Sequence, residues 1–254
     1  MSTKPQTVVQ PSLEALSREA AARLQWLAEE SITAAGRFSV ALSGGSTPLV
    51  LYRSLAEPPF REAIGWSRVH LFWGDERFVP ADHPDSNYRA AQEVFVSRLP
   101  IPAENVHPIP TGPADPESAA AQYEDTLRRF FSLSEADMPR FDLVLLGLGP
   151  DGHTASLFPG SPALDEHKRL VVAAYVPKLA TWRITLTPPV LRGASNVTFL
   201  VAGPDKAAIL QDVLEGPYDP HRLPAQLVRP EEGTLTWLVD EAAACLLSAG
   251  LKGR

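Results

Sequence analysis

The chain has 254 residues, 44% of them hydrophobic and 21% charged, which is the composition of an ordinary globular protein and excludes a disordered, collagen-like or coiled-coil chain. Its 23 basic and 30 acidic residues give a net charge of −7, and no run of lysine and arginine interrupts it. We therefore expect no nucleic-acid partner and no anionic membrane partner.

The single cysteine, Cys245, excludes an internal disulfide framework and predicts a reducing, cytoplasmic location. It lies between three alanines and two leucines, so we expect a small, buried apolar side chain. The first residues hold no apolar signal core and no apolar run approaches 18 residues, so we expect neither Sec export nor a membrane span.

Helical and strand patterns alternate along the first half of the chain. Ser12 can cap a helix over 13–35, which Gly36 would end. The next predicted elements are a strand over 37–42, a helix over 48–55, a strand over 69–73, a helix over 87–98 capped by Ser86, and a helix over 117–132 after a proline-rich crossing.

The second half continues the alternation. Strands are predicted over 142–147, 171–174, 183–187, 197–201 and 235–239, with helices over 188–193 and 205–214 and a closing helix. Nearly continuous apolar strands separated by helices are typical of a mostly parallel sheet that is covered on both faces. No linker or repeat divides the chain, so we predict one α/β domain over residues 1–254, doubly wound and Rossmann-like.

Ligands of such sheets bind beyond the carboxyl ends of the strands. The first loop in that position is Ser43-Gly44-Gly45-Ser46-Thr47, where the glycines allow close backbone approach and the following helix offers free N–H groups. This pattern predicts an anion site, most simply for phosphate, with a capped tight turn as the alternative. It is not a P-loop, because the Gly-Lys-Ser/Thr ending is missing.

The second loop places Asp75, Glu76 and Arg77 directly after the strand over 69–73. Three charges at this position are costly unless they meet a solvent-filled cleft or each other. Arg77 can hold a carboxylate or phosphate with two hydrogen bonds. A solvated charged turn is the alternative.

The third loop, over 147–153, matches the G-x-G-x-x-G dinucleotide pattern, but Asp151 would repel a pyrophosphate and Pro150 restricts the turn. We interpret it instead as a glycine-rich loop that presents Asp151 and His153. A histidine oriented by a carboxylate is a general base or acid. A core or capping histidine is the alternative.

Two cations, Arg183 and Lys206, follow later strands. Each alone is most simply a surface charge, but together with the loop over 43–47 they could neutralise a phosphate. The chain has no G-x-S-x-G and no H-E-x-x-H, so neither an α/β-hydrolase triad nor a tightly bound zinc is expected.

These loops, in this order and spacing, resemble those of the 6-phosphogluconolactonase family. The resemblance covers nearly the whole chain and is carried by residues 41–48, 72–80, 85–87, 146–160, 183–187 and 203–206. It implies a fold similar to that of glucosamine-6-phosphate deaminase and ribose-5-phosphate isomerase.

The resemblance also implies an enzyme of the oxidative pentose phosphate pathway that hydrolyses 6-phospho-D-glucono-1,5-lactone to 6-phosphogluconate. It implies no cofactor, no metal, no obligatory protein partner and a phosphosugar lactone as the ligand. The family's phosphate site falls on Gly44, Gly45, Ser46, Thr47, Arg183 and Lys206. Its catalytic histidine falls on His153 with Asp151 beside it, while Arg77 and Asp75 would stabilise developing charge or bind a sugar hydroxyl.

Two other functions compete with this one. The amino-sugar deaminase and isomerase branch carries Asp-Glu-Tyr where this chain has Asp75-Glu76-Arg77, and an extra acid after its Asp-Gly-His segment. A phosphosugar sensor would need no Asp-x-His pair, and no helix-turn-helix segment is attached. Both comparisons favour the lactonase.

Overall fold

The computed structural model describes residues 5–112 and 115–251. Within them, seven strands form a sheet in the order β1-β10-β9-β6-β2-β3-β5, and every neighbouring pair is parallel. Its strands are β1 (Gln6–Gln10), β2 (Phe38–Leu42), β3 (Val69–Trp73), β5 (Val106–His107), β6 (Leu143–Leu146), β9 (Asn196–Val201) and β10 (Thr234–Asp240).

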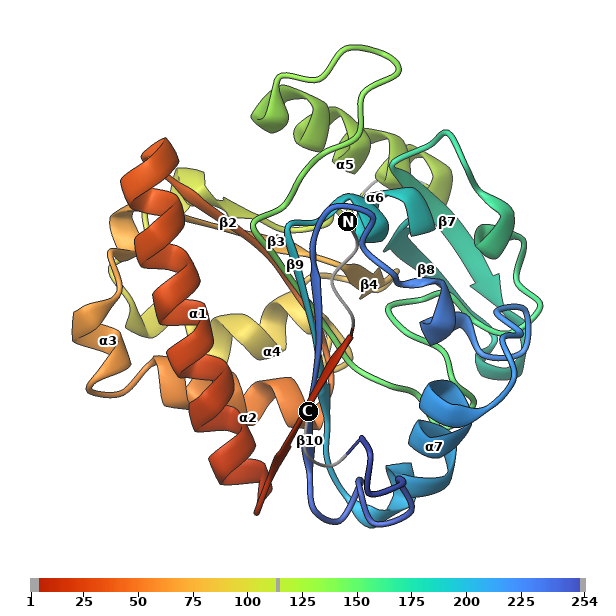
Figure 1. Cartoon of the computed structure of the whole chain (residues 1–254). Coiled ribbons are helices and arrows are strands. Elements are labelled where there is room, and N and C mark those ends of the chain that lie inside the picture. Colours follow the sequence, from red (N-terminus) through yellow and green to blue (C-terminus); the bar gives the residue numbers. More distant parts are fainter. Residues whose placement is uncertain (1–4, 113–114, 252–254) are drawn as a thin grey trace.

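Helices cover both faces of this sheet (Figure 1). One face carries α1 (Leu13–Ala35), α2 (Ser46–Leu55), α3 (Phe60–Ala63) and α4 (Asn87–Val94). The other carries α5 (Pro116–Phe131), α6 (Pro188–Gly193) and α7 (Ala207–Glu215). The predicted α/β class and the mostly parallel, doubly covered sheet are confirmed.

A second, smaller sheet packs beside the first (Figure 1). Its strands are β4 (Asp75–Arg77), β8 (Thr181–Leu186) and β7 (Val171–Val176), in the antiparallel order β4-β8-β7. The sequence predicted a loop at Asp75–Arg77 and placed the strands predicted over 171–174 and 183–187 in the parallel sheet. Both expectations are wrong, because the backbone of the charged segment pairs with β8 instead of turning through solvent.

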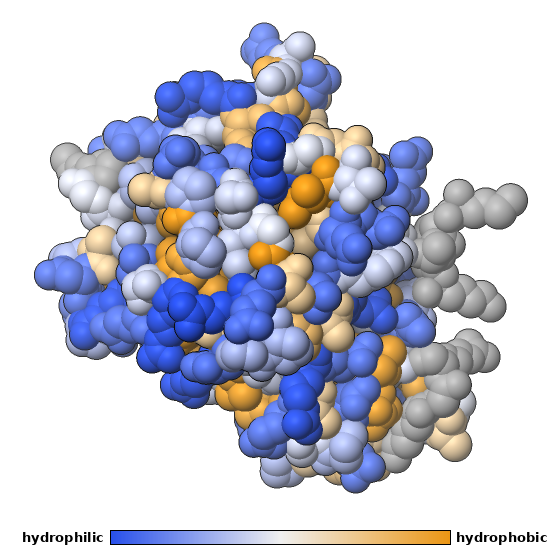
Figure 2. Space-filling view, turned by 90° about the vertical axis from the view of Figure 1, so that its left-hand side faces the viewer, coloured by the Kyte–Doolittle hydropathy of each residue, from blue (hydrophilic) through white to orange (hydrophobic). Residues whose placement is uncertain are grey.

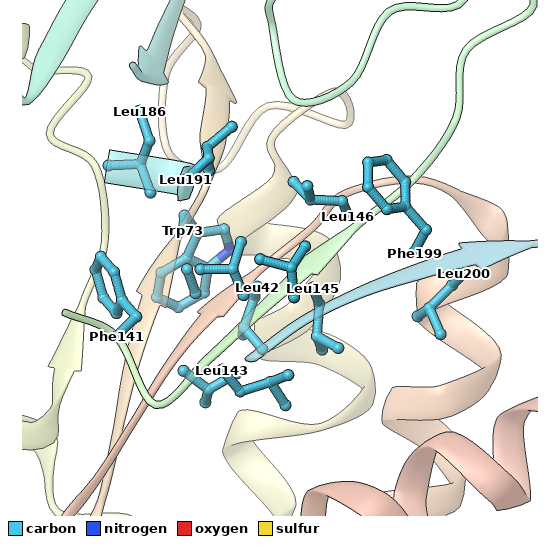
Figure 3. Close-up of a cluster of buried hydrophobic side chains, with 14 of the residues drawn as sticks. Leu42, Trp73, Phe141, Leu143, Leu145, Leu146, Leu186, Leu191, Phe199 and Leu200 are labelled. Atoms are coloured by element: carbon cyan, nitrogen blue, oxygen red, sulfur yellow. The ribbon is translucent and has the colours of Figure 1, made fainter. Parts of the chain in front are cut away.

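The core lies between the main sheet and its helices. Figure 3 shows Leu42 of β2, Trp73 of β3 and Leu145 of β6 within one cluster, and all three are buried. Burying a leucine side chain stabilises a fold by about 1.5–3 kcal/mol. The same apolar runs that predict the strands therefore hold the strand ends, and the loops that follow them, in place.

The first helix follows its sequence signals. Ser12 caps it by accepting a hydrogen bond from the backbone N–H of Ala15 at 3.3 Å, and Gly36 ends it in the left-handed conformation with φ of 74°. Leu16, Leu24 and Leu27 are buried on its inner face. The predicted range of 13–35 is confirmed.

Other boundaries differ from the expectation. The helix predicted over 87–98 ends at Val94 and continues as the 3-10 turn η2 (Val96–Arg98). Strands β1 and β5 and the short α3 were not predicted. Six further 3-10 turns connect the described elements: η1 (Trp66–Arg68), η3 (Ala103–Asn105), η4 (Pro162–Asp165), η5 (Pro177–Leu179), η6 (Pro204–Lys206) and η7 (Pro224–Leu227).

The predicted closing helix does not form within the residues described after β10; they make turns instead. The carboxylate of Asp240 accepts hydrogen bonds from the backbone N–H groups of Ala243, at 2.7 Å, and Gly203, at 3.1 Å, and so bends the chain. Ala243 and Ala244 then face the core, whereas Cys245 is exposed. The expectation that Cys245 is buried is therefore wrong.

No helix in the described ranges is both long and apolar enough to cross a bilayer. The side of the molecule that carries α1 and α3 is mainly hydrophilic, with apolar residues in small, separate patches (Figure 2). Single exposed apolar side chains, such as that of Trp26, are ordinary on a globular surface.

Candidate active site

A cavity of about 310 Å³ lies beyond the carboxyl ends of β2, β3 and β6. Residues from four separate segments that the sequence singled out line it together: Ser43, Gly44, Gly45, Asp75, Arg77, His153 and Arg183. The loops after β2 and β6 of the main sheet thus meet Asp75, Arg77 and Arg183, which the second sheet supplies.

The loop after β2 approaches the cavity with its backbone. Ser43 is fixed by Tyr52 of α2: its N–H donates to the Tyr52 hydroxyl at 3.0 Å, and that hydroxyl donates to the Ser43 carbonyl at 2.7 Å. A Cβ on Gly44 would lie 2.0 Å from Oδ1 of Asn87, so a larger residue there would displace the Asn87 amide. Gly45, with φ of 103°, leads into the first turn of α2.

Asp75 enters the cavity from β4 and is buried. Its Oδ2 accepts a hydrogen bond from the Ser156 hydroxyl at 2.7 Å, and its backbone carbonyl accepts one from the Asn87 amide at 3.0 Å. Asn87 also lines the cavity. The sequence did not single out Ser156, and Asn87 entered only as part of the family resemblance.

Glu76 has its side chain in the interior, at the start of α4. Its carboxylate accepts three backbone hydrogen bonds of 2.8 Å, from Arg77, Asn87 and Tyr88, and one of 3.1 Å from the Ser86 hydroxyl. Burial raises the pKa of this carboxyl, and the three N–H donors oppose that rise. The anion thus joins β4 to the amino end of α4 and fixes the residues on either side of it.

Arg77 and Arg183 are direct cross-strand partners between β4 and β8. The Nε atoms of both are buried and have no hydrogen-bond partner among the described residues. Burial lowers the pKa of Arg183, and the charge of Arg77 lowers it further, against the raising effect of Asp75. Both arginines line one cavity and have unused donors. An anionic ligand in that cavity could accept hydrogen bonds from the two guanidinium groups.

His153 lies on the glycine-rich loop after β6. Its Nδ1 contacts Oδ1 of Asp151, and its ring stacks on Phe158 with 4.2 Å between the ring centroids. Gly149 makes room for the imidazole, because a Cβ there would lie 2.0 Å from Nδ1. With Nδ1–H donated to the carboxylate, Nε2 keeps its lone pair.

Burial lowers the pKa of His153 to about 4. The carboxylate of Asp75 acts against this, whereas the positive charges of Arg183 and Lys206 lower the pKa further. The imidazole is therefore neutral at pH 7, in the form that can accept a proton.

The remaining sequence candidates lie outside the cavity lining. Oδ1 of Asp151 contacts Nδ1 of His153, and Oδ2 of Asp151 contacts Nζ of Lys178. Lys206 follows β9 in η6, with Nζ 3.6 Å from Oδ2 of Asp205. Ser46 and Thr47 open α2 beside the lining. Their expected contribution to phosphate binding stays a prediction.

No cluster of three or more histidine, cysteine, aspartate or glutamate side chains in the described ranges could hold a metal ion. Phe158, Lys178 and Leu179 are parts of the site that the sequence did not indicate. Phe158 lies within the motif that carries the resemblance, but nothing local marks Lys178 or Leu179, since only the pairing of β7 with β8 brings them here.

Comparison with known proteins identifies relatives of this chain. The family model described as glucosamine-6-phosphate isomerases/6-phosphogluconolactonase matches residues 11–237. A 6-phosphogluconolactonase of Synechocystis sp. is 45% identical over 214 residues, which cover 84% of this chain and 86% of that protein. One of Nostoc sp. is 43% identical over 220 residues, with coverages of 87% and 89%.

The solved structures agree. The 6-phosphogluconolactonase from Trypanosoma cruzi superposes with a TM-score of 0.86 at 32% identity, covering 98% of this chain and 99% of that one. A monomeric glucosamine-6-phosphate deaminase has a TM-score of 0.78 at 20% identity, covering 95% and 99%, and shows the shared fold alone.

Proposed function

The chain belongs to the glucosamine-6-phosphate isomerase/6-phosphogluconolactonase family, and from that membership we infer that it is a lactone hydrolase whose substrate is 6-phospho-D-glucono-1,5-lactone. The family name covers two activities. The relatives at 43–45% identity bear the lactonase name, whereas the deaminase shares only the fold.

One observation supports this choice above the others: a neutral histidine, bound to a carboxylate, shares a cavity with two arginines. Hydrolysis of a phosphorylated lactone needs a base to activate water and cations to hold a dianion. His153 can supply the base, and Arg77 with Arg183 can supply the cations.

In the proposed mechanism, Nε2 of His153 takes a proton from a water molecule as its oxygen attacks C1 of the lactone. The bond between C1 and the ring oxygen then breaks, and the imidazolium returns the proton to that oxygen. The product is the open-chain 6-phosphogluconate. Asp151 holds Nδ1–H throughout and stabilises the transient imidazolium.

The phosphate group is proposed to bind between Arg183, Lys206 and the loop over 43–47. Arg77, opposite Arg183 in the sheet, adds a second guanidinium for the anionic oxygens of the same ligand. A bound dianion also offsets the two positive charges that lower the pKa of His153. Substrate binding would therefore make His153 a stronger base.

The test compares two substrates on the purified chain: freshly prepared 6-phospho-D-glucono-1,5-lactone, with spontaneous hydrolysis subtracted, and glucosamine 6-phosphate. We expect acceleration of lactone hydrolysis and no release of ammonia. Ammonia release, without any effect on the lactone, would assign the chain to the other activity of the family.

A further inference from the structure

The hairpin of β7 and β8 reaches the site at two points. Its second strand carries Arg183, which lines the cavity. Its tip is η5 (Pro177–Leu179), followed by Ala180 in the left-handed conformation with φ of 48°. At this tip Leu179 also lines the cavity, and Nζ of Lys178 contacts Oδ2 of Asp151.

Lys178 therefore contacts both groups that support the imidazole of His153. Its Nζ lies 4.9 Å from the ring centroid of Phe158, the ring that stacks on His153. It also contacts one oxygen of the Asp151 carboxylate while the other oxygen contacts Nδ1 of His153. No other basic side chain in the described part of the chain forms an ion pair with Asp151, apart from His153 itself.

We propose that Lys178 is a positioning residue, which orients the Asp151 carboxylate towards His153. This inference rests on the proposed role of His153 as the general base. A carboxylate on a loop can rotate about its side-chain bonds, and a cation that holds one oxygen directs the other to Nδ1. The Nδ1–H tautomer, with Nε2 ready to accept a proton, follows from that orientation.

The geometry separates this role from phosphate binding. Lys178 lies outside the cavity lining, and its contacts are with Phe158, which stacks on the imidazole, and with Asp151, which contacts Nδ1 and not Nε2. Its side chain is 53% exposed, so its contribution is modest. Loss of Lys178 should consequently reduce turnover without weakening substrate affinity.

The experiment is a double-mutant cycle with steady-state kinetics on the phosphorylated lactone. Lys178→Met, which keeps the apolar stem and removes the charge, should lower kcat about 3- to 10-fold with KM within about twofold. Lys178→Arg should restore most of kcat. In an Asp151→Asn background, Lys178→Met should lower kcat by less than about twofold further, because its partner is already lost.

Lys168→Met is the matched control, since Lys168 is another exposed lysine shortly before β7. It should leave kcat and KM unchanged, and all variants should keep the unfolding temperature of the wild type. If Lys178→Met instead raises KM only for the phosphorylated substrate, Lys178 is a phosphate ligand and the inference is overturned.

Equal losses in the wild-type and Asp151→Asn backgrounds, or no loss at all from Lys178→Met, would also overturn it. These outcomes leave the proposed function intact, provided that His153→Ala and Asp151→Asn themselves reduce kcat. If neither of those two variants reduces kcat, the proposed mechanism and the role of Lys178 fail together.

Discussion

At the scale of single residues, the site brings opposed charges together in a partly buried cavity. Burial and two nearby cations favour the neutral form of His153, while Asp75 favours the charged form. A neutral imidazole is the right form for a general base, but a pKa near 4 makes it a weak one. We expect the phosphate of the bound substrate to raise this pKa by offsetting the two cations.

We therefore predict that a phosphosugar raises the pKa of His153. Without ligand, the imidazole should stay neutral as the pH falls from about 7 to 5, because its pKa is about 4. Saturation with glucitol 6-phosphate, which carries a phosphate but no carboxylate, should shift the onset of protonation to higher pH. An NMR titration of the His153 ring measures both, with unphosphorylated glucitol as the control. An onset that the phosphosugar leaves unchanged would contradict the proposed contacts of Arg183 and Lys206.

The arginine pair leads to a second prediction, in which a substitution weakens substrate binding but does not lower stability. Arg183→Met should raise KM about 10- to 150-fold for the phosphorylated lactone, as expected for loss of a charged hydrogen bond. It should leave KM for the unphosphorylated gluconolactone nearly unchanged. Since burial and Arg77 already disfavour this charge, its removal should not lower the unfolding temperature of the free protein. Lower stability with unchanged KM would show that Arg183 has a structural role only.

At the scale of elements, the buried carboxylate of Glu76 explains why a charged segment can be a strand. Three backbone N–H groups and the Ser86 hydroxyl satisfy it. Those of Asn87 and Tyr88, with the hydroxyl, lie at the amino end of α4, where a helix favours negative charge, and the third belongs to Arg77. β4 and α4 are thereby fixed relative to each other, with Asp75, Arg77 and Asn87 beside the cavity.

Glu76→Gln should accordingly destabilise the fold. The glutamine amide has one acceptor oxygen instead of two. Its own N–H groups would face N–H groups whose hydrogen bonds the carboxylate accepts. We expect a loss of about 1.5–3 kcal/mol in the free energy of unfolding, from thermal or urea denaturation. Glu93→Gln on the same helix is the control, because Glu93 forms an exposed pair with Arg89 and should contribute less than about 1 kcal/mol. Similar effects of the two substitutions would mean that Glu76 does not join β4 to α4.

The elements that the sequence predicted correctly are those whose signals are local. The apolar runs of β2, β3 and β6 and the caps of α1 are visible in short windows, and the loops that follow the three strands come with them. β4 was mistaken for a loop because, apart from the N–H of Arg77, the donors for Glu76 lie ten or more residues away. The closing helix was wrong because the residues after β10 make turns. The bond from Ala243 to the Asp240 carboxylate resembles a helix cap, but the same carboxylate also binds Gly203 on a distant loop, which the sequence does not reveal.

The site divides in the same way. His153, Asp151 and the loop over 43–47 could be found from motifs, since glycine spacing and charge order mark them. The pairing of Arg77 with Arg183 depends on the register of β4 with β8, and Lys178 depends on the reach of a hairpin tip. Neither follows from a pattern within one segment.

At the scale of the whole molecule, the cavity lies where two sheets meet. The main parallel sheet supplies the backbone loop after β2 and the histidine loop after β6, and the antiparallel sheet supplies Arg77 and Arg183. The proposed base therefore comes from the main sheet, whereas the proposed anion site combines residues of both sheets. A single domain over residues 1–254 and a cytoplasmic location remain predictions.

The most direct test of this account separates those two parts by steady-state kinetics on freshly prepared 6-phospho-D-glucono-1,5-lactone, with the spontaneous rate subtracted. His153→Ala should lower kcat about 10²- to 10⁴-fold and change KM little, because it removes proton transfer. Lys206→Ala should mainly raise KM, by about 10- to 150-fold, because it removes a charged hydrogen bond to the phosphate. Both variants should unfold at the wild-type temperature. The reverse pattern, with His153→Ala changing only KM and Lys206→Ala abolishing turnover at saturation, would contradict the assignment and transfer the chemistry to Lys206.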